Sequence, residues 1–211
     1  MSLLTKDQTM PTVAILDAPL VIQFDPVIQM DDDQFFDFCQ INRHLRIERT
    51  AQREVIIMPP AGGETGSRNA MLTMQVGMWA KRDGNGVSFD SSTGFILPNG
   101  ATRSPDAAWV SRARLALLSS AQKEKFLPLC PDFVVELASP TDTLHALQTK
   151  MTEYIDNGAQ LGWLLLPDTH KIYVYRPDQP VEELQSIGLL KGDPILPGFT
   201  LDLSDIWEPG F

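Results

Sequence analysis

The segment 132–138 constrains the fold of this chain more than any other stretch. Its residues, Asp-Phe-Val-Val-Glu-Leu-Ala, are apolar on both faces of an extended strand. This pattern is typical of a central strand that is covered on both sides. Glu136 lies within the strand, where an unpaired ionised carboxylate would be costly. The sequence therefore predicts a layered fold in which Glu136 has a cationic partner, either a basic side chain or a divalent metal ion.

The flanking segments predict helices and strands in alternation. A helix is expected from Ser139-Pro140-Thr141-Asp142 to about Gly158, and the simplest role for Asp142 is that of helix N-cap. The other expected helices cover about 31–44 and 64–82, and the expected strands cover 45–49, 54–58, 87–90, 94–97, 105–110, 161–166 and 172–175. This order predicts a single mixed α/β domain with a central mixed β-sheet flanked by helices. We expect residues 1–30, which are punctuated by prolines, to form an N-terminal arm and residues 31–211 to form the domain.

Asp106 is the second candidate site residue. It follows Pro105 and begins the apolar strand Ala-Ala-Trp-Val. If its strand neighbours that of Glu136, the two carboxylates can converge on one metal ion, and sequential strands often pair. Asp132 also follows a proline and competes for this role, but it would lie about two strand residues further out.

Lys150 is a candidate because of its place on the predicted helix. It lies at the edge of the apolar stripe formed by Leu144, Leu147, Met151 and Tyr154. From there its ammonium can bend toward the helix start, where the strand of Glu136 ends. It could polarise an attacking water, or it could be a border lysine whose stem covers the core.

Glu64 is a further candidate site residue. Glu64 could reach the cleft from the first turn of its helix, or simply favour the helix dipole.

The chain has 27 Asp and Glu against 17 Lys and Arg, a net charge of −10, which at first argues against a nucleic-acid partner. Residues 43–125, however, hold 12 basic and 7 acidic residues. The distribution therefore allows salt-sensitive nucleic-acid binding over one basic face.

Other classes of protein fit the sequence less well. It contains no Gly-x-Ser-x-Gly nucleophile elbow and no complete phosphate-binding glycine loop. Its two cysteines, Cys39 and Cys130, lie in apolar surroundings and form no Cys-x-x-Cys motif. No apolar run approaches the roughly 20 residues that span a membrane. We therefore expect a cytoplasmic protein without membrane contact.

At these residues the chain resembles a known family. The resemblance covers roughly residues 27–190 and includes a Pro-Asp pair at 105–106 and Pro-Asp-Phe-Val-Val-Glu at 131–136. It is also carried by the segments 35–39, 45–49, 57–64, 139–142 and 162–168. The sequence is similar to bacterial Uma-type restriction endonucleases of the PD-(D/E)XK nuclease superfamily. The resemblance implies a restriction-endonuclease-like core, cleavage of DNA phosphodiester bonds with Mg²⁺ or Mn²⁺, a duplex DNA substrate and a homodimer.

Carried over residue by residue, the resemblance makes Asp106 and Glu136 the metal ligands. The superfamily lysine would stand two residues after Glu136, where this chain has Ala138. Either Lys150 supplies the cation from the next helix, or this copy is inactive, or the family performs different chemistry. Glu64 would match an acid that some superfamily members use beside the metal.

The sequence is compatible with three alternative functions. The first is a metal-dependent endonuclease with Asp106, Glu136, Lys150 and Glu64 as catalytic residues. The second is a degenerate nuclease fold that binds DNA or protein, for which Ala138 is the evidence. The third is a different hydrolase or a purely structural dimer.

Overall fold

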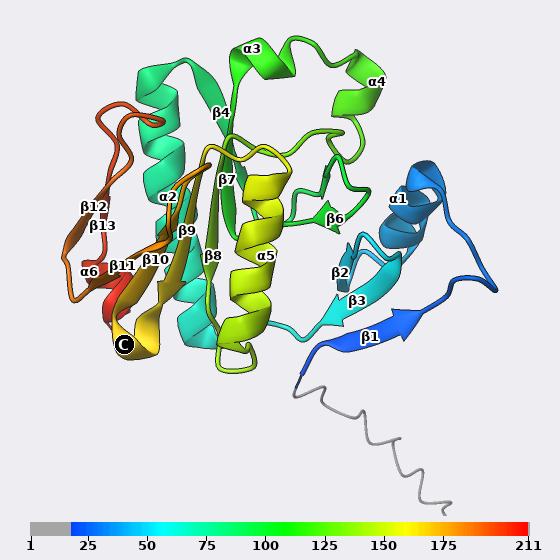
Figure 1. The fold of residues 1–211 in the computed structure, drawn as a ribbon, viewed down its shortest axis with the longest axis horizontal. Coiled ribbons are helices and arrows are strands. Elements are labelled where there is room, and N and C mark those ends of the chain that lie inside the picture. The colour runs from blue at the N-terminus through cyan, green and yellow to red at the C-terminus, as the bar shows by residue number, and fades with distance from the viewer. Residues whose placement is uncertain (1–17, 211) are drawn as a thin grey trace, which may run out of the picture.

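The computed structural model describes residues 18–210, which form a six-stranded sheet, a five-stranded sheet and a small two-stranded sheet, with helices packed around them (Figure 1). The expected mixed α/β fold is confirmed. The sequence predicts one central sheet, whereas the structure has a second large sheet built from the N-terminal half of the chain. Residues 1–17 of the expected N-terminal arm lie outside the described residues.

The larger sheet has six strands in the order β11-β10-β9-β8-β7-β4. Their bounds are β4 Gly86–Asp90, β7 Ala107–Ser111, β8 Phe133–Leu137, β9 Leu161–Leu166, β10 Lys171–Tyr175 and β11 Glu182–Gln185. Strands β8 and β9 are parallel and the other pairs are antiparallel, so the sheet is mixed as expected. The strand predicted at 132–138 lies inside this sheet, and every residue of β8 is buried.

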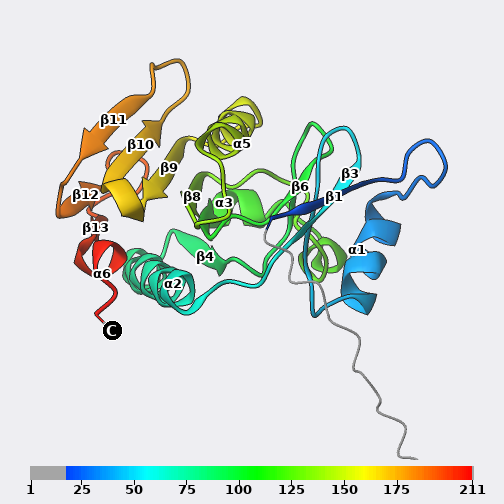
Figure 2. The same ribbon diagram turned by 90° about the horizontal axis from the view of Figure 1, so that it is seen from below.

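Two long helices cover opposite faces of the larger sheet (Figure 2). They are α2, Gly63–Asp83, and α5, Leu144–Asp156. Along β8, Phe133, Val135 and Leu137 pack in the cluster on the α2 side, while Val134 packs in the cluster on the α5 side. Because side chains alternate along a strand, Glu136 shares the α5 face with Val134.

The start of α5 corrects one prediction. Thr143, and not Asp142, is the N-cap, because the Thr143 side chain accepts from the Ala146 N–H. The Asp142 carboxylate instead accepts from the backbone N–H and the hydroxyl of Ser139. Asp142 therefore stabilises the turn that precedes the helix, because its short side chain binds the nearby donors of Ser139 and not an N–H of the first helical turn.

The five-stranded sheet, called the N-terminal sheet below, has the strand order β1-β3-β2-β6-β5. Its bounds are β1 Leu20–Gln23, β2 Arg46–Arg49, β3 Glu54–Met58, β5 Phe95–Ile96 and β6 Thr102–Arg103. Helix α1, Asp32–Ile41, packs on this sheet through Phe35. The predicted hairpin at 45–58 is confirmed as β2 and β3. Residues 20–23 of the expected arm form β1, paired with β3.

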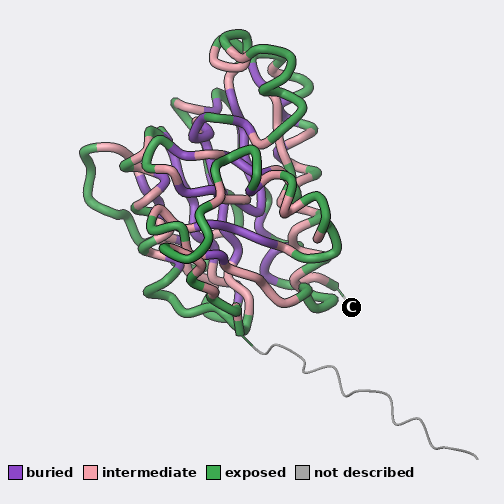
Figure 3. Tube along the Cα trace, turned by 90° about the vertical axis from the view of Figure 1, so that its right-hand side faces the viewer, coloured by how far each residue is buried: buried purple, intermediate pink, exposed green. Residues whose placement is uncertain are grey.

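The remaining elements are short. They are α3 Arg112–Leu115, α4 Ser120–Lys123, η1 Pro167–Thr169, β12 Leu189–Lys191, β13 Thr200–Asp202 and α6 Ser204–Trp207. The C-terminal pieces pack on the α2 side of the larger sheet. Figure 3 shows the buried residues gathered in the interior of the molecule and the exposed ones mainly on its outer loops. No helix within residues 18–210 combines the length and apolar character that a membrane crossing requires.

Candidate active site

Asp106 and Glu136 lie side by side on neighbouring strands. Strands β7 and β8 are antiparallel, with Ala107 opposite Val135, so Asp106 stands opposite Glu136 at the same end of the sheet. The Leu137 N–H donates to Asp106 Oδ2 at 2.8 Å. Both carboxylates are buried, with exposed fractions of 6% and 4%. The predicted adjacency of the two strands is confirmed.

Lys150 reaches this pair from α5, as its place on the helix predicted. Its Nζ lies 2.9 Å from Glu136 Oε1. Position 138 is an alanine, and its backbone N–H continues the sheet by donating to the Leu165 carbonyl. The ammonium that a lysine at 138 would supply therefore comes from the helix that follows the strand.

The structure adds Glu48, which the sequence analysis did not identify. Glu48 lies on β2 of the N-terminal sheet with 3% of its surface exposed. Its Oε1 lies 2.9 Å from Lys150 Nζ and accepts from the Ser104 N–H at 3.0 Å. Its Oε2 accepts from Arg103 Nη1 at 3.2 Å, and Arg103 Nε donates to Glu153. Charges on a short hairpin strand ordinarily face solvent, so no local pattern marks Glu48 as buried.

Three further side chains contact the two acids. The Tyr154 hydroxyl donates to Glu136 Oε1 at 2.9 Å, so Tyr154 is more than part of the apolar stripe. Asn69 Nδ2 on α2 donates to Asp106 Oδ1 at 3.3 Å. Arg46 Nη2 lies 3.6 Å from the same oxygen. Asp106 is thus fixed by groups from three elements, whereas both donors to Glu136, Lys150 and Tyr154, come from α5.

The three buried carboxyl groups of the site have pKa values shifted in different directions. Burial raises the pKa of Glu136 to about 7; Lys150 opposes this shift, and Asp106 and Glu48 add to it. Burial also raises the pKa of Asp106 above its ordinary value, against the Leu137 N–H. Burial alone would raise the pKa of Glu48, but Lys150 and Arg103 outweigh it and the net shift is downward. At neutral pH, Glu48 is therefore the fixed anion of the group and Glu136 the adjustable one.

Lys150 remains an ammonium ion. Burial would lower its pKa, but the carboxylates of Glu136 and Glu48 outweigh that effect and raise it above the ordinary lysine value. Lys150 can therefore supply a positive charge and three hydrogen-bond donors, and it cannot act as a base near neutral pH.

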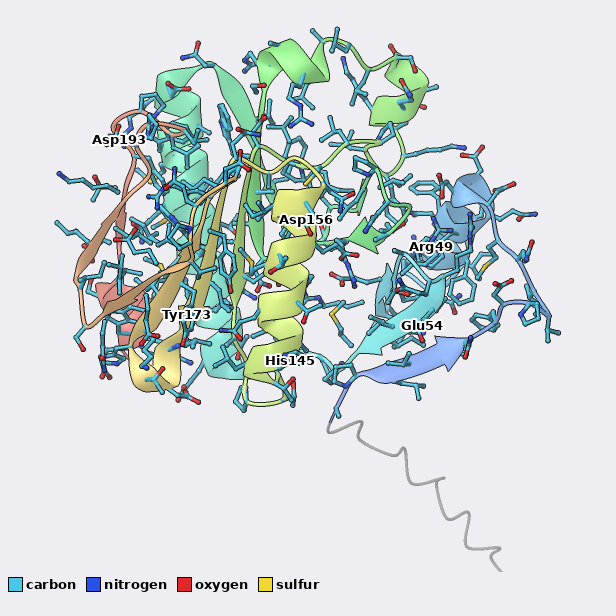
Figure 4. All side chains as sticks on the ribbon, viewed as in Figure 1. Arg49, Glu54, His145, Asp156, Tyr173 and Asp193 are labelled. Carbon is cyan, nitrogen blue, oxygen red and sulfur yellow. The ribbon has the colours of Figure 1, made fainter. Side chains whose placement is uncertain are left out.

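The site borders a cleft with a volume of about 1200 Å³, and the cleft lining includes Arg46, Glu48, Asp106, Glu136 and Lys150. It lies between the N-terminal sheet on one side and α5 and the end of β8 on the other, and the start of α2 also borders it. Figure 4 labels Arg49 and Glu54 in the N-terminal sheet and His145 and Asp156 near the two ends of α5. The lining includes seven Asp or Glu residues and four Lys or Arg residues. The cleft is therefore acidic although the segment 43–125 is basic overall.

Two other acids occupy different places. Glu64 lines the cleft, but its carboxylate pairs with Arg68 one helical turn away and is 61% exposed. The structure thus does not bring Glu64 into contact with Asp106 or Glu136. Asp132 lies at the opposite end of β8 from the site, where it accepts from the Ser111 N–H and pairs with Arg114.

The donor set is suited to a hard divalent cation with few protein ligands. Among residues 18–210, no three His, Cys, Asp or Glu residues are arranged to hold a metal ion by themselves. Mg²⁺, however, is commonly bound through one or two carboxylates together with water and substrate phosphate. Two facing buried carboxylates with raised pKa values provide such a pair. In the described part of the chain nothing donates to Glu136 Oε2, which leaves that oxygen for a ligand from the cleft.

Comparison with known proteins identifies the family to which the chain belongs. The profile of the Uma2 family, described as "Putative restriction endonuclease", matches residues 32–204. The chain belongs to the Uma2 family. A crystal structure of a "putative nuclease belonging to DUF820" from Anabaena variabilis ATCC 29413 has a similar fold, with a TM-score of 0.66 and 18% sequence identity. The match covers 76% of this chain and 89% of that one. Among curated protein sequences none matches the chain.

Family membership supports a nuclease function and confirms the resemblance on which the sequence analysis relied. The structural match supports the restriction-endonuclease-like fold. In a Uma2 protein, the cluster of Asp106, Glu136 and Lys150 is the candidate catalytic centre.

Proposed function

We propose that this Uma2 protein is a divalent-metal-dependent endonuclease that hydrolyses phosphodiester bonds of duplex DNA. The observation that carries the proposal is the convergence of Asp106, Glu136 and Lys150 at one end of β7 and β8. Two carboxylates beside an ammonium, all bordering an open cleft, form a site for a cation and a phosphate group.

Asp106 and Glu136 would hold Mg²⁺ or Mn²⁺. Such an ion, when bound, activates water and neutralises negative charge on a phosphate. The Leu137 N–H and Asn69 hold Asp106 in place, and Tyr154 and Lys150 hold Glu136. This chain's residues therefore supply a preorganised pair of acids that needs no rearrangement of the sheet.

Lys150 acts as a charge in this proposal. Its ammonium stands beside the metal-binding carboxylate, where it can orient a water or stabilise charge that develops on the phosphate. The same arrangement weakens the case for a degenerate nuclease fold. That alternative rested on Ala138, and Lys150 supplies a cation at Glu136 from a different element.

A plasmid-nicking assay with Mg²⁺ or Mn²⁺ tests the proposal. Wild-type protein should nick supercoiled DNA. Asp106→Asn and Glu136→Gln should each abolish nicking, and Lys150→Met should lower the nicking rate strongly but leave a residual rate that can be measured. Asp156→Asn is the matched control, because this exposed carboxylate on α5 lies outside the cleft. Glu64→Gln should retain activity if the ion pair with Arg68 describes its whole role. Duplex binding without cleavage under any of these conditions would favour the degenerate fold instead.

A further inference from the structure

Glu48 approaches Lys150 from a different sheet than Glu136 does. Glu136 belongs to β8 of the larger sheet and Lys150 to α5 beside it, whereas Glu48 belongs to β2 of the N-terminal sheet. Lys150 Nζ lies 2.9 Å from a carboxylate oxygen of each glutamate. The ammonium therefore bridges the two sheets.

Glu48 is the better fixed of the two partners. Both of its oxygens are occupied, one by Lys150 and the Ser104 N–H and the other by Arg103. Arg103 is held in turn, because its Nε donates to Glu153 at 2.6 Å. A carboxylate anchored in this way can hold a mobile partner at a defined place.

Lys150 has the more flexible side chain of the pair. Its ammonium sits on a flexible four-carbon stem. Without Glu48, the only carboxylate left to hold this ammonium would be Glu136, which is itself a candidate metal ligand. An ion that binds Glu136 competes with Lys150 for that carboxylate. Only an anchor outside the metal pair keeps the ammonium in place while Glu136 is engaged.

We propose that Glu48 is a positioning residue that holds Lys150 Nζ beside Glu136, which makes the N-terminal sheet part of the catalytic centre. The functional consequence rests on the proposed nuclease function. The positioning itself does not, so the two can fail separately.

A purely structural role is the competing explanation. Glu48, Arg103 and Glu153 form a buried ion network between the N-terminal sheet and α5, and such a network could serve only to join them. Glu153 offers a matched control, because its side chain is 15% exposed, it binds the same arginine, and no hydrogen bond or ion pair joins it to Lys150 in the described structure.

Competitive acetylation of the lysines, read by mass spectrometry with the exposed Lys123 as internal reference, tests the positioning. An ammonium released from one of its two carboxylates loses its proton more easily and reacts faster. Glu48→Gln should raise the labelling rate of Lys150 by about tenfold, the effect of one pKa unit. Glu153→Gln should leave that rate unchanged. Equal increases in both variants, or none in Glu48→Gln, would overturn the proposal.

Glu48→Asp provides a second variant in case Glu48→Gln does not fold. It keeps the charge for Arg103 but is one methylene too short to hold all three partners, so it should also raise the labelling of Lys150. Unchanged labelling in a folded Glu48→Asp variant would contradict the proposal.

Nicking rates separate the positioning from a general structural effect. Glu48→Gln should lower kcat by about 100-fold, which is typical for a misplaced catalytic group, and should have no further effect in a Lys150→Met background. Equal losses in both backgrounds would overturn the proposal. If wild-type protein cuts no DNA, the nuclease function fails, and the labelling experiment still decides whether Glu48 holds Lys150.

Discussion

Glu136 places a carboxylate within the buried strand β8 of the larger sheet. A carboxylate in the middle of a buried strand is costly, and one ammonium shared with Glu48 only partly compensates for it. Asp106 opposite adds a second negative charge. This imbalance fits a site that receives a cation, because a divalent ion would relieve the repulsion between the two acids.

The metal-free protein should lose stability as the pH rises from about 4.5 to above 7. The pKa of Glu136 is raised from 4.5 to about 7 in the folded state, so its contribution to stability is complete below pH 4.5 and is lost as pH rises through 7. The loss from this residue is on the order of 3 kcal/mol.

Urea unfolding of Glu136→Gln across pH 4–8, with EDTA present, checks this. The variant should show a flatter profile than wild type, with a residual slope from Asp106, whose pKa is also raised. Identical profiles for the two proteins would contradict the assigned burial cost.

At the scale of elements, the local sequence explains most helix and strand bounds. Helix α2 ends where Gly84 adopts a positive φ of 76°, with Lys81 and Arg82 in its last turn. Ser119 and Gln122 form a reciprocal capping box at α4. Packing between elements then depends on close approaches that no single element reveals.

Gly86 on β4 marks one such approach. A Cβ at this position would lie 2.2 Å from the ring of Trp109, which packs in the core on β7. Gly86→Ala should therefore destabilise the protein by about 1–3 kcal/mol through overpacking.

Gly66→Ala is the matched control within α2. A Cβ there would meet no atom within 4 Å, so the alanine should stabilise the helix by about 0.5–1 kcal/mol. Chemical denaturation of both variants measures the difference. A neutral Gly86→Ala would mean that β4 is held less tightly against Trp109 than the structure shows.

At the scale of the whole molecule, buried charges join the N-terminal sheet to the larger sheet and its helix. Arg103 is 11% exposed at its side chain and pairs with both Glu48 and Glu153. Removing it would leave two carboxylates without their shared partner, at a cost much greater than that of a surface pair.

Arg103→Met should therefore reduce the free energy of unfolding by about 3–5 kcal/mol. Arg176→Met is the control, because Arg176 pairs with the half-exposed Glu182 and should cost less than about 1 kcal/mol. Thermal and urea unfolding of both variants test the comparison. Similar losses would show that the network does not join the two sheets.

DNA binding should depend on divalent cations. The cleft lining carries three more acids than bases, so it repels phosphate until a cation is present. Fluorescence anisotropy with a labelled duplex should show binding with Ca²⁺, weaker binding at higher salt, and none in EDTA. Tight binding in EDTA would place the DNA on another face.

The sequence alone determined the features that depend on local pattern. The doubly apolar strand predicted the buried β8, and the break in that pattern predicted that Glu136 has a cationic partner. Helical periodicity placed Lys150 at the edge of the core, and the structure confirms its contact with Glu136. These predictions succeeded because strand alternation and helix periodicity are set by residues close together in the chain.

Only the tertiary structure decided the rest. Glu48 and Lys150 are 102 residues apart, and Glu48 and Arg103 are 55 apart, so nothing local indicates that they meet. The N-terminal sheet, the outward position of Glu64 and the acidic balance of the cleft likewise depend on how distant segments pack. Short charged strands look solvent-exposed in sequence, and Glu48 is buried beside Lys150 only because the two sheets pack together.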